Sequence, residues 1–273
     1  MALLHRSRRP PVRIAADGRA YLNVGSGAHG SPEWNNVDLL RAPGVVRHDL
    51  RRPLPYDTDR FDAVYASHVL EHFDPDRGLA LLVEMRRVAS PGAPVRIVVP
   101  DLERICRDYL ARLSEAVEAS TPEARRRLAW MRIELLDQMV RTRSGGRMLA
   151  AIASGEVDPA EARARLGDEL AAVIDAGGQQ RPGAVRRPRA MLARVAASAL
   201  ARWRTPARTG ELHRWMYDRV SLAEAMTAAG LRDVRQVAHD ESSIPAWERW
   251  ALDTSRFGPG PRKPDSLYME GLA

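Results

Sequence analysis

Residues 68–72, His-Val-Leu-Glu-His, place two imidazoles and a carboxylate within one short stretch. The spelling is also that of the inverted zinc-hydrolase motif H-x-x-E-H, in which two histidines one helical turn apart bind Zn²⁺. That alternative needs a long helix and a further acidic ligand, whereas Asp74-Pro75 closes this segment almost at once. The sequence therefore favours His68 and His72 as candidate acid–base groups and predicts no metal site.

A second chemical motif is a glycine-rich turn, Gly25-Ser26-Gly27, which opens a G-x-G-x-x-G pattern directly after an apolar run. Glycines there let the backbone turn sharply and approach a ligand closely. Asp38 ends the next run, where a carboxylate can bind both hydroxyls of a ribose, and Asp49 lies in the third, where an acid can reach an adenine amino group. A dinucleotide site expects its acid about 20 residues after the glycines. Asp38 comes sooner, which favours a compact nucleoside ligand over NAD.

The elements that must position these residues are short apolar runs separated by helical spacing and turns. Strands are predicted over 20–24, 35–39, 45–50, 61–67, 94–99, 233–238 and 266–270. Helices are predicted over 77–88 and over 221–229, the latter with Ser221 as its N-cap. Because near-continuous apolar strands that alternate with helices form parallel sheets, we expect an α/β fold.

The middle of the chain has a different composition. Residues 111–210 are rich in Ala, Arg, Glu and Leu, contain no convincing strand, and predict a helical insertion that can act as a lid. The predicted organisation is an N-terminal extension over 1–19, a cofactor-binding core over 20–110, this insertion, and a part over 211–273 that completes the sheet.

Four segments resemble class I S-adenosylmethionine-dependent methyltransferases: YLNVGSG (21–27), NNVDL (35–39), HDLRRPLPY (48–56) and FDAVYASHVLEHF (61–73). The chain looks closest to small bacterial predicted methyltransferases of surface-polysaccharide gene clusters. HRWMYDRVSLAEAMTAAGL (213–231) and KPDSLYMEG (263–271) are similar to that group too. The resemblance covers residues 20–110 and 211–273. It implies a Rossmann-like, mostly parallel, seven-stranded sheet.

The resemblance also implies a cofactor, S-adenosylmethionine, with S-adenosylhomocysteine as product. It places Gly25 and Gly27 against the methionine and ribose part, and Asp38 on the ribose hydroxyls. Asn23 stands where many of these enzymes carry an acid before the first glycine. The remaining implied contacts are Asp49 and the backbone of Leu50 at adenine, and Ser67 and His68 beside the methionine moiety.

Methyl transfer from a sulfonium is an in-line displacement that depends on holding nucleophile, methyl carbon and sulfur collinear. A hydroxyl or ammonium acceptor must also lose a proton, so a base helps. The candidate bases are His68, His72, Asp101 and His213. Asp101 is equally a helix N-cap, and His213 is equally a packed side chain in a polar-aromatic cluster. Family context favours oxygen of a small-molecule or glycan-type acceptor.

The overall composition indicates which class of protein this is and which kinds of site it excludes. The chain has 273 residues with 45% hydrophobic and 28% charged, which is typical of a globular protein. A single cysteine, Cys106, excludes an internal disulfide and a cysteine-cluster metal site. No apolar run reaches the ~18 residues of a membrane helix, and Met1–Arg13 lacks an apolar signal region. We expect a cytoplasmic protein of undetermined oligomeric state.

The net charge of +7 comes almost entirely from arginine, since Lys263 is the only lysine. Residues 190–204 form a basic amphipathic segment, which fits part of a lid, contact with an anionic membrane surface, or nucleic acid phosphates. One aromatic residue and no binding motif disfavour nucleic acid. A cofactor-binding protein without transferase activity remains the alternative function. Among Trp215, Trp247 and Trp250, we expect at least two to fill a core.

Overall fold

The computed structural model describes residues 9–27, 30–157, 159–168 and 211–273. The chain divides into two compact units. The first unit comprises Met1–Pro100, Tyr217–Leu252 and Ser266–Ala273, and the second comprises Asp101–Met216 and Asp253–Asp265. The basic segment 190–204 lies outside the described residues.

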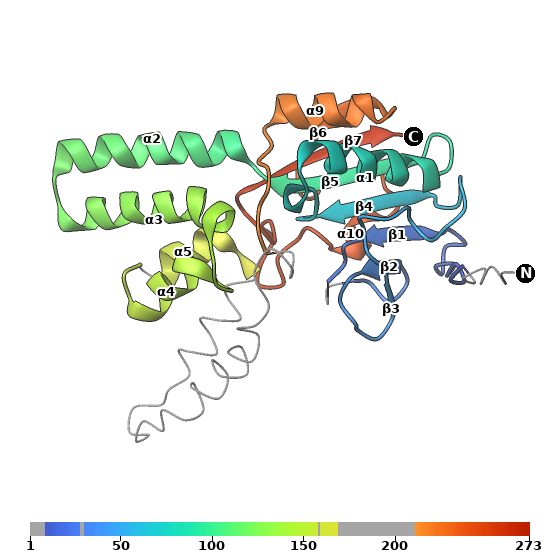
Figure 1. Ribbon diagram of the computed structural model, residues 1–273, viewed down its shortest axis with the longest axis horizontal. Coiled ribbons are helices and arrows are strands. Elements are labelled where there is room, and N and C mark those ends of the chain that lie inside the picture. The colour runs from blue at the N-terminus through green and yellow to red at the C-terminus, as the bar shows by residue number, and fades with distance from the viewer. Residues whose placement is uncertain (1–8, 28–29, 158, 169–210) are drawn as a thin grey trace, which may run out of the picture. The chain divides into compact units, whose positions relative to one another are not determined.

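The first unit is built on one seven-stranded sheet (Figure 1). Its strands are β1 (Tyr21–Val24), β2 (Asn35–Asp38), β3 (Val45–Arg47), β4 (Ala63–Ser67), β5 (Pro94–Pro100), β6 (Arg232–Gln236) and β7 (Ser266–Leu272). They lie in the order β3-β2-β1-β4-β5-β7-β6. β1 to β5 are parallel, whereas β7 runs antiparallel to β5 and to β6. This confirms the predicted Rossmann-like, mostly parallel, seven-stranded sheet of class I methyltransferase type.

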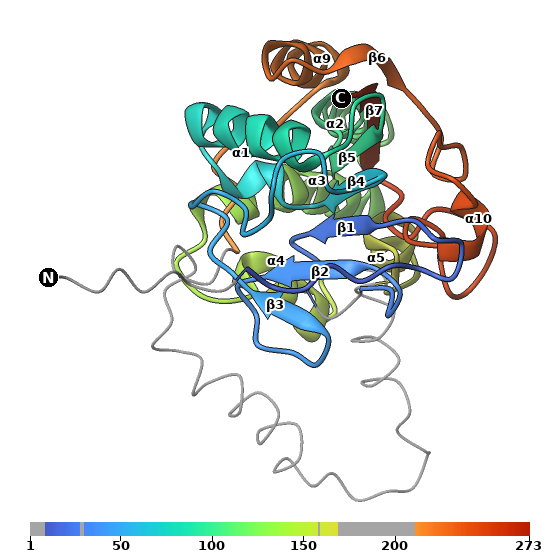
Figure 2. The same ribbon diagram turned by 90° about the vertical axis from the view of Figure 1, so that its right-hand side faces the viewer.

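Two helices cover one face of the sheet, α1 (Pro75–Val88) and α9 (Arg219–Ala228), which lie side by side in Figures 1 and 2. Leu82 and Met85 of α1 and Met226 of α9 are fully buried in the same cluster as strand side chains of β1, β4 and β5. Burying each such side chain stabilises the fold by about 1.5–3 kcal/mol. Leu82, Met85 and Val88, three of the positions whose spacing predicted helix 77–88, therefore lie on its buried face.

The opposite face carries the short helix α10 (Trp247–Trp250), which lies across the sheet from α1 in Figure 2. Aromatic side chains fill this layer: the Trp34 ring stacks on Tyr21 with centroids 5.0 Å apart, and Trp250 meets Trp34 edge-on at 5.8 Å. Trp247 and Trp250 are buried, which confirms the core role predicted for two tryptophans, while Trp215 is 44% exposed.

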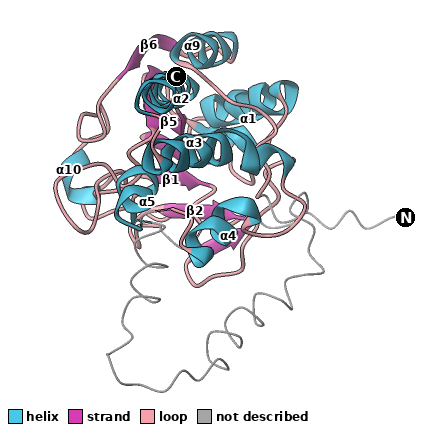
Figure 3. Cartoon of the chain, turned by 90° about the vertical axis from the view of Figure 1, so that its left-hand side faces the viewer, coloured by secondary structure: helices cyan, strands magenta, loops and turns pink. Residues whose placement is uncertain are grey.

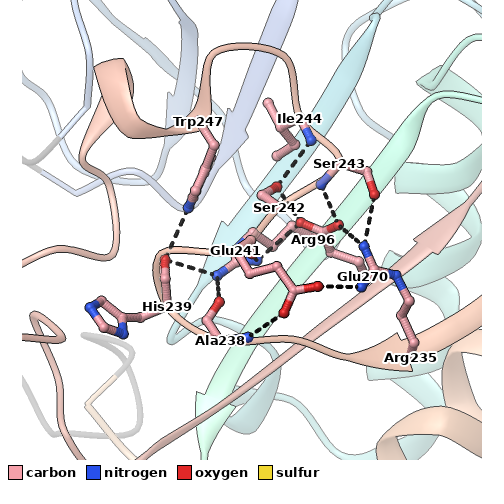
Figure 4. Close-up of polar contacts among 10 residues, drawn as sticks. All are labelled: Arg96, Arg235, Ala238, His239, Glu241, Ser242, Ser243, Ile244, Trp247 and Glu270. Carbon is pink, nitrogen blue, oxygen red and sulfur yellow. Dashed lines mark hydrogen bonds and ion pairs between the residues drawn. The ribbon is translucent and has the colours of Figure 1, made fainter.

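A buried ion pair also stands on this aromatic face (Figure 4). The Arg96 guanidinium in β5 donates to Glu270 Oε1 in β7 at 3.0 Å and lies over the Trp247 ring, 4.5 Å from its centroid. Its other donors reach the backbone carbonyls of the 238–241 turn, at 2.8 Å for Glu241 and 3.0 Å for Ala238. One side chain therefore fixes both the neighbouring strand and the loop that leads to α10.

The helix starts differ from those expected. Asp74 accepts from the Arg77 N–H and caps α1, with Pro75 in the first turn, so Asp74-Pro75 begins the helix. The prediction of Ser221 as the second N-cap is wrong. Asp218 is the N-cap of α9, and Ser221 bonds back to the Asp218 N–H in a capping box.

The second unit is helical over most of its described length (Figure 3), with α2 (Leu102–Ala119), α3 (Pro122–Val140), α4 (Gly146–Ser154) and α5 (Pro159–Leu166). Trp130 and Met131 of α3 pack with Ile105 of α2 in its core. Arg165 joins the unit internally through the buried Glu134 at 2.6 Å and Asp108 at 2.9 Å. Within the described ranges, no helix has both the length and the hydrophobicity needed to cross a bilayer.

Candidate functional site

The glycine turn lies at the carboxyl end of β1, as the sequence predicts. Gly25 and Gly27 have φ of +70° and +53°, a region that favours glycine. A Cβ at Gly25 would lie 2.2 Å from Val69 Cγ2, whereas a Cβ at Gly27 would meet nothing within 4 Å. Gly25 is thus required for packing against the segment after β4, and Gly27 leaves open backbone at the sheet edge.

Asp38 joins this turn to the end of β2. Its Oδ2 accepts from the Gly27 N–H at 2.8 Å, and its Oδ1 accepts from the Leu40 N–H at 2.6 Å. The carboxylate is partly exposed, so oxygen lone pairs remain open to a ligand. Asp38 therefore both holds the turn and presents charge at the carboxyl edge, where ligands bind in open α/β sheets.

Asp49 and Leu50 follow β3 and are both partly exposed. Arg51 grips the Asp49 carboxylate with two donors, Nε at 2.8 Å and an Nη at 2.7 Å. This side-chain pairing with Arg51 lowers the pKa of Asp49 to about 2. Asp49 is thus a fixed anion, and its predicted contact with adenine stays a prediction.

Asn23 lies within β1 and is buried. Its Nδ2 approaches Asn36 Oδ1 on β2 at 3.4 Å, and Asn36 in turn donates to the Ser31 carbonyl at 2.9 Å. The pair therefore secures the loop between β1 and β2. Asn23 thus stabilises the segment after β1 through Asn36. Its predicted contact with the methionine part of the cofactor stays a prediction.

Ser67 is the last residue of β4, and His68 follows it with φ of +54°. The His68 N–H donates to the Val98 carbonyl of β5 at 2.8 Å, which holds this unusual backbone in place. The ring bridges two groups: Nε2 lies 2.8 Å from Ser266 Oγ and Nδ1 lies 3.2 Å from Glu71 Oε1. His68 therefore stands at the same edge as the glycine turn, with both ring nitrogens engaged.

The rest of the H-x-x-E-H motif forms a single turn of 3₁₀ helix, η1 (Leu70–His72). Glu71 is fully buried, and its Oε1 lies 4.0 Å from His72 Nε2. His68 precedes this turn in a left-handed conformation, so the two histidines do not share the face of an α-helix. The zinc-hydrolase motif uses that shared face, so His68 and His72 do not form its ligand pair here.

The other two candidate bases belong to the second unit. Asp101 follows β5 and accepts from the Arg104 N–H at 3.1 Å, as the N-cap of α2, and burial raises its pKa. His213 is buried, with its backbone N–H on the Gln138 carbonyl at 3.0 Å and its Nε2 at 2.8 Å from Gln138 Nε2. Both alternatives weighed from the sequence, cap and packed side chain, are present, and a catalytic role for either stays a prediction.

The sequence did not single out the roles of three further residues of this edge. Leu39 and Leu40 directly follow Asp38 and are 48% and 47% exposed. An exposed apolar pair beside a carboxylate suits a nucleoside, which has an apolar base and a diol. Ser266 reaches His68 only because β7 is antiparallel and pairs Ser266 with Pro100 at the end of β5. An apolar Leu-Leu after the aspartate was a readable signal, whereas the Ser266 contact was not.

Comparison with known proteins agrees with this geometry. Residues 30–97 match the model of a family described as a methyltransferase domain. The matched range includes Asp38, Asp49, Ser67 and His68. No curated protein matches the chain. The matched segment runs from the loop before β2 into β5 and includes the strand ends after β2 and β4.

Solved methyltransferase structures resemble the chain at low identity. A 1,6-didemethyltoxoflavin-N1-methyltransferase from Burkholderia thailandensis, solved with S-adenosylhomocysteine, is 18% identical with a TM-score of 0.28 and covers 33% of this chain and 46% of that chain. A chain from the complex of the Haloferax volcanii Trm112 methyltransferase activator with a methyltransferase is 12% identical, with a TM-score of 0.38. The match covers 97% of this chain and 85% of that chain. A SAM dependent methyltransferase from Archaeoglobus fulgidus is 13% identical, with a TM-score of 0.37. The match covers 93% of this chain and 86% of that chain. The chain spans less than half the length of the first of these structures.

Proposed function

We propose that this chain is a class I S-adenosylmethionine-dependent methyltransferase that methylates an oxygen of a small-molecule or glycan-type acceptor. The observation that carries the proposal is the Asp38 carboxylate at the end of β2, 2.8 Å from the Gly27 N–H of the glycine turn. A carboxylate beside open backbone, followed by exposed leucines, offers a nucleoside one group for its hydroxyls and a surface for its base. The match of 30–97 to a methyltransferase domain supports the same conclusion.

The places of the cofactor-binding residues at the carboxyl edge support the roles proposed for them. When bound, S-adenosylmethionine supplies a methyl carbon on a positively charged sulfur. Gly25 and Gly27 would give it backbone contact and Asp38 would accept from the ribose hydroxyls. Leu39 and Leu40 offer an apolar surface for adenine. Asp49 and the Leu50 backbone would contact the adenine amino edge, with the Asp49 carboxylate shared with Arg51.

The acceptor side requires a group that takes a proton. Of the four candidate bases, His68 stands at the edge that carries the glycine turn, and imidazole is the side chain best suited to proton transfer near neutral pH. Ser67 and His68 would lie beside the methionine part. His72, Asp101 and His213 remain candidates for contact with the acceptor.

The context of the reaction rests on the sequence resemblance. It supports a role in surface-polysaccharide biosynthesis, with residues 111–210 closing over the acceptor as a lid. Residues 190–204 would allow peripheral contact with an anionic membrane. Unchanged acceptor selectivity after deletion of the insertion, in a chain that still folds, would contradict the lid.

Calorimetric titration with S-adenosylmethionine and S-adenosylhomocysteine tests the central claim. We expect micromolar binding to the wild type, and a loss of about ten-fold or more in Asp38→Ala, since a hydrogen bond to a charged group contributes about 1.5–3 kcal/mol. Asp62→Ala is the matched control. Asp62 also accepts from a backbone N–H of the β1 segment, that of Ala20 at 2.8 Å, but at the opposite end of the strand.

The outcomes separate the alternatives. Binding lost in Asp38→Ala and kept in Asp62→Ala would support the site, provided that circular dichroism shows both variants folded. Absence of binding to either ligand in the folded wild type would refute it. Binding without turnover on a broad acceptor panel would favour a non-catalytic cofactor-binding protein.

A further inference from the structure

Three polar side chains form a line at the carboxyl edge of the sheet in the first unit. The Glu71 carboxylate comes from η1, the His68 imidazole from the end of β4, and the Ser266 hydroxyl from the start of β7. Glu71 Oε1 lies 3.2 Å from His68 Nδ1, and His68 Nε2 lies 2.8 Å from Ser266 Oγ. The two contacts use opposite nitrogens of one ring, so the imidazole connects the carboxylate to the hydroxyl.

The order of these groups determines where the protons lie. Glu71 Oε1 faces His68 Nδ1 at ion-pair distance without hydrogen-bond alignment, and the negative charge of a carboxylate there favours the proton on Nδ1. In the neutral ring Nε2 then carries a lone pair, which accepts from the Ser266 hydroxyl. The basic nitrogen of His68 is thereby directed at a hydroxyl rather than at the protein interior.

The three side chains are largely buried, which strengthens the polar contacts among them. Glu71 is fully buried and Ser266 is 7% exposed, whereas 13% of the His68 side chain remains exposed. Glu71 thus faces the ring from the protein interior, on the side opposite the hydroxyl that Nε2 meets. His68 also holds φ of +54°, which is costly for a residue other than glycine and clusters at functional sites.

From this geometry we infer that Glu71, His68 and Ser266 form a proton relay for the methyl acceptor, an inference that rests on the proposed methyltransferase function. His68 is the base and Ser266 passes the proton to it. Glu71 is a positioning residue, since it acts through the tautomer and orientation of His68. The arrangement selects an acceptor whose nucleophile must be deprotonated, which fits a hydroxyl.

The proton balance of the step is complete. The acceptor oxygen forms a bond to the methyl carbon as the bond from that carbon to sulfur breaks. The hydroxyl proton of the acceptor moves to Ser266 Oγ while the Ser266 proton moves to His68 Nε2. The positive charge of the sulfonium is thus replaced by that of the imidazolium beside Glu71, and the proton leaves to solvent afterwards.

The first test needs neither acceptor nor cofactor. In the full chain labelled with ¹⁵N-histidine, long-range proton–nitrogen correlation identifies which ring nitrogen carries the proton, and His68→Asn assigns the signal among the seven histidines. At a pH where the ring is neutral, we expect the Nδ1–H form of His68 in the wild type. Glu71→Met, which removes the acceptor and keeps an unbranched chain, should shift the ring toward Nε2–H.

Two results would overturn the relay: Nε2–H as the main form of His68 in the wild type, or an unchanged Nδ1–H form in folded Glu71→Met. If Glu71→Met does not fold, the wild-type spectrum still decides. A held tautomer in a chain that binds no S-adenosylmethionine would instead refute the proposed function, so the two failures are distinguishable.

The second test uses methyl transfer to a hydroxyl acceptor from the screening panel. Ser266→Ala and Glu71→Met should lower kcat by about 100-fold or more, the contribution typical of general-base catalysis, with KM for S-adenosylmethionine changed less than about two-fold. Glu71→Gln, which keeps an acceptor oxygen, should recover part of the loss. Ser242→Ala is the matched control, because the Ser242 hydroxyl also bonds to a side chain of the first unit, that of the buried Glu270, but on the loop before α10. Loss of kcat in Ser242→Ala equal to that in Ser266→Ala would show that the effect is only structural.

Discussion

Replacing Arg96 with methionine should cost this protein a large share of its stability. Arg96 is fully buried in β5 and pairs with Glu270 Oε1 at 3.0 Å, and Glu270 is itself 2% exposed. Methionine keeps much of the aliphatic length and removes every donor. The variant therefore leaves the buried carboxylate without its nearest cation, with Arg235 3.8 Å from Oε2 as a second one. It also leaves the carbonyls of the 238–241 turn without the donors of Arg96.

The magnitude follows from these losses. Removing one partner of a buried ion pair costs about 3–5 kcal/mol, mainly because the remaining charge is desolvated and uncompensated. Glu270 keeps hydrogen bonds from the Ser243 N–H, at 2.8 Å, and from the Ser242 hydroxyl, and it keeps the Arg235 guanidinium at 3.8 Å, all of which reduce the penalty. The lost carbonyl contacts act in the other direction. We therefore expect about 4 kcal/mol, against a total of about 5–15 kcal/mol for a typical native protein.

Urea unfolding followed by tryptophan fluorescence is the direct assay, because Trp247 lies against the Arg96 guanidinium at 4.5 Å. Arg126→Met is the matched control. Arg126 also pairs with a glutamate, Glu123, but the two side chains are 56% and 59% exposed. Exposed pairs contribute about 0–1 kcal/mol, so this variant should unfold close to the wild type.

A double variant distinguishes the ion pair from simple loss of packing. Arg96→Met with Glu270→Met also removes the buried carboxylate, so it should be more stable than Arg96→Met alone, with a coupling free energy of about 1–3 kcal/mol. An Arg96→Met cost below about 1 kcal/mol, or additive effects of the two substitutions, would refute the reasoning.

Two further predictions concern the glycine turn and the loss of folding stability at acid pH. Gly25→Ala should lower stability by about 1–3 kcal/mol and abolish S-adenosylmethionine binding in calorimetry, because its Cβ would lie 2.2 Å from Val69 Cγ2. Gly44→Ala is the matched control, because Gly44 has φ of +73° and a Cβ there would meet nothing within 4 Å. It should lower stability by only about 1 kcal/mol, the cost of the left-handed backbone for alanine. Equal losses of stability in the two variants would contradict the packing argument. The hydrogen bonds from Arg87 lower the pKa of Glu84, so Glu84 stabilises the fold above its unfolded pKa of about 4.3, and that stabilisation is lost as pH falls through the folded value. Glu84→Gln should therefore unfold more easily near pH 7 and show a smaller loss between about pH 5 and 3; an unchanged acid profile would contradict this.

The sequence predicts the sheet because its central strands are buried on both faces. Strands such as β5 then appear as apolar runs, and each predicted strand overlaps an observed one. Arg96 is the exception inside such a run. Its partner Glu270 lies 174 positions away, and nothing local indicates that β7 brings the carboxylate beside it. A charged residue in a buried strand indicates that an oppositely charged partner exists, but only the strand order of the folded sheet shows which residue it is.

The same limit applies to the site. Asp38 is predictable because a carboxylate that ends the second parallel strand must lie at the edge that carries the glycine turn, and the contact to Gly27 is in place. His68 is predictable as an edge residue for the same reason. Its orientation is not, since it depends on Ser266 from the far end of the chain and on a left-handed backbone that local propensity disfavours.

The buried ion pair and the proposed relay depend on the same strand. β7 pairs Ser266 with Pro100 and Glu270 with Arg96, so both side chains lie in one register and on one face. A slip by one residue would turn both to the opposite face, separating Ser266 from His68 and Glu270 from the guanidinium together. Apolar neighbours such as Leu267 and Met269 would tolerate that slip far better than a carboxylate would. Arg96 therefore fixes the register of β7, and the register fixes the hydroxyl that faces the base.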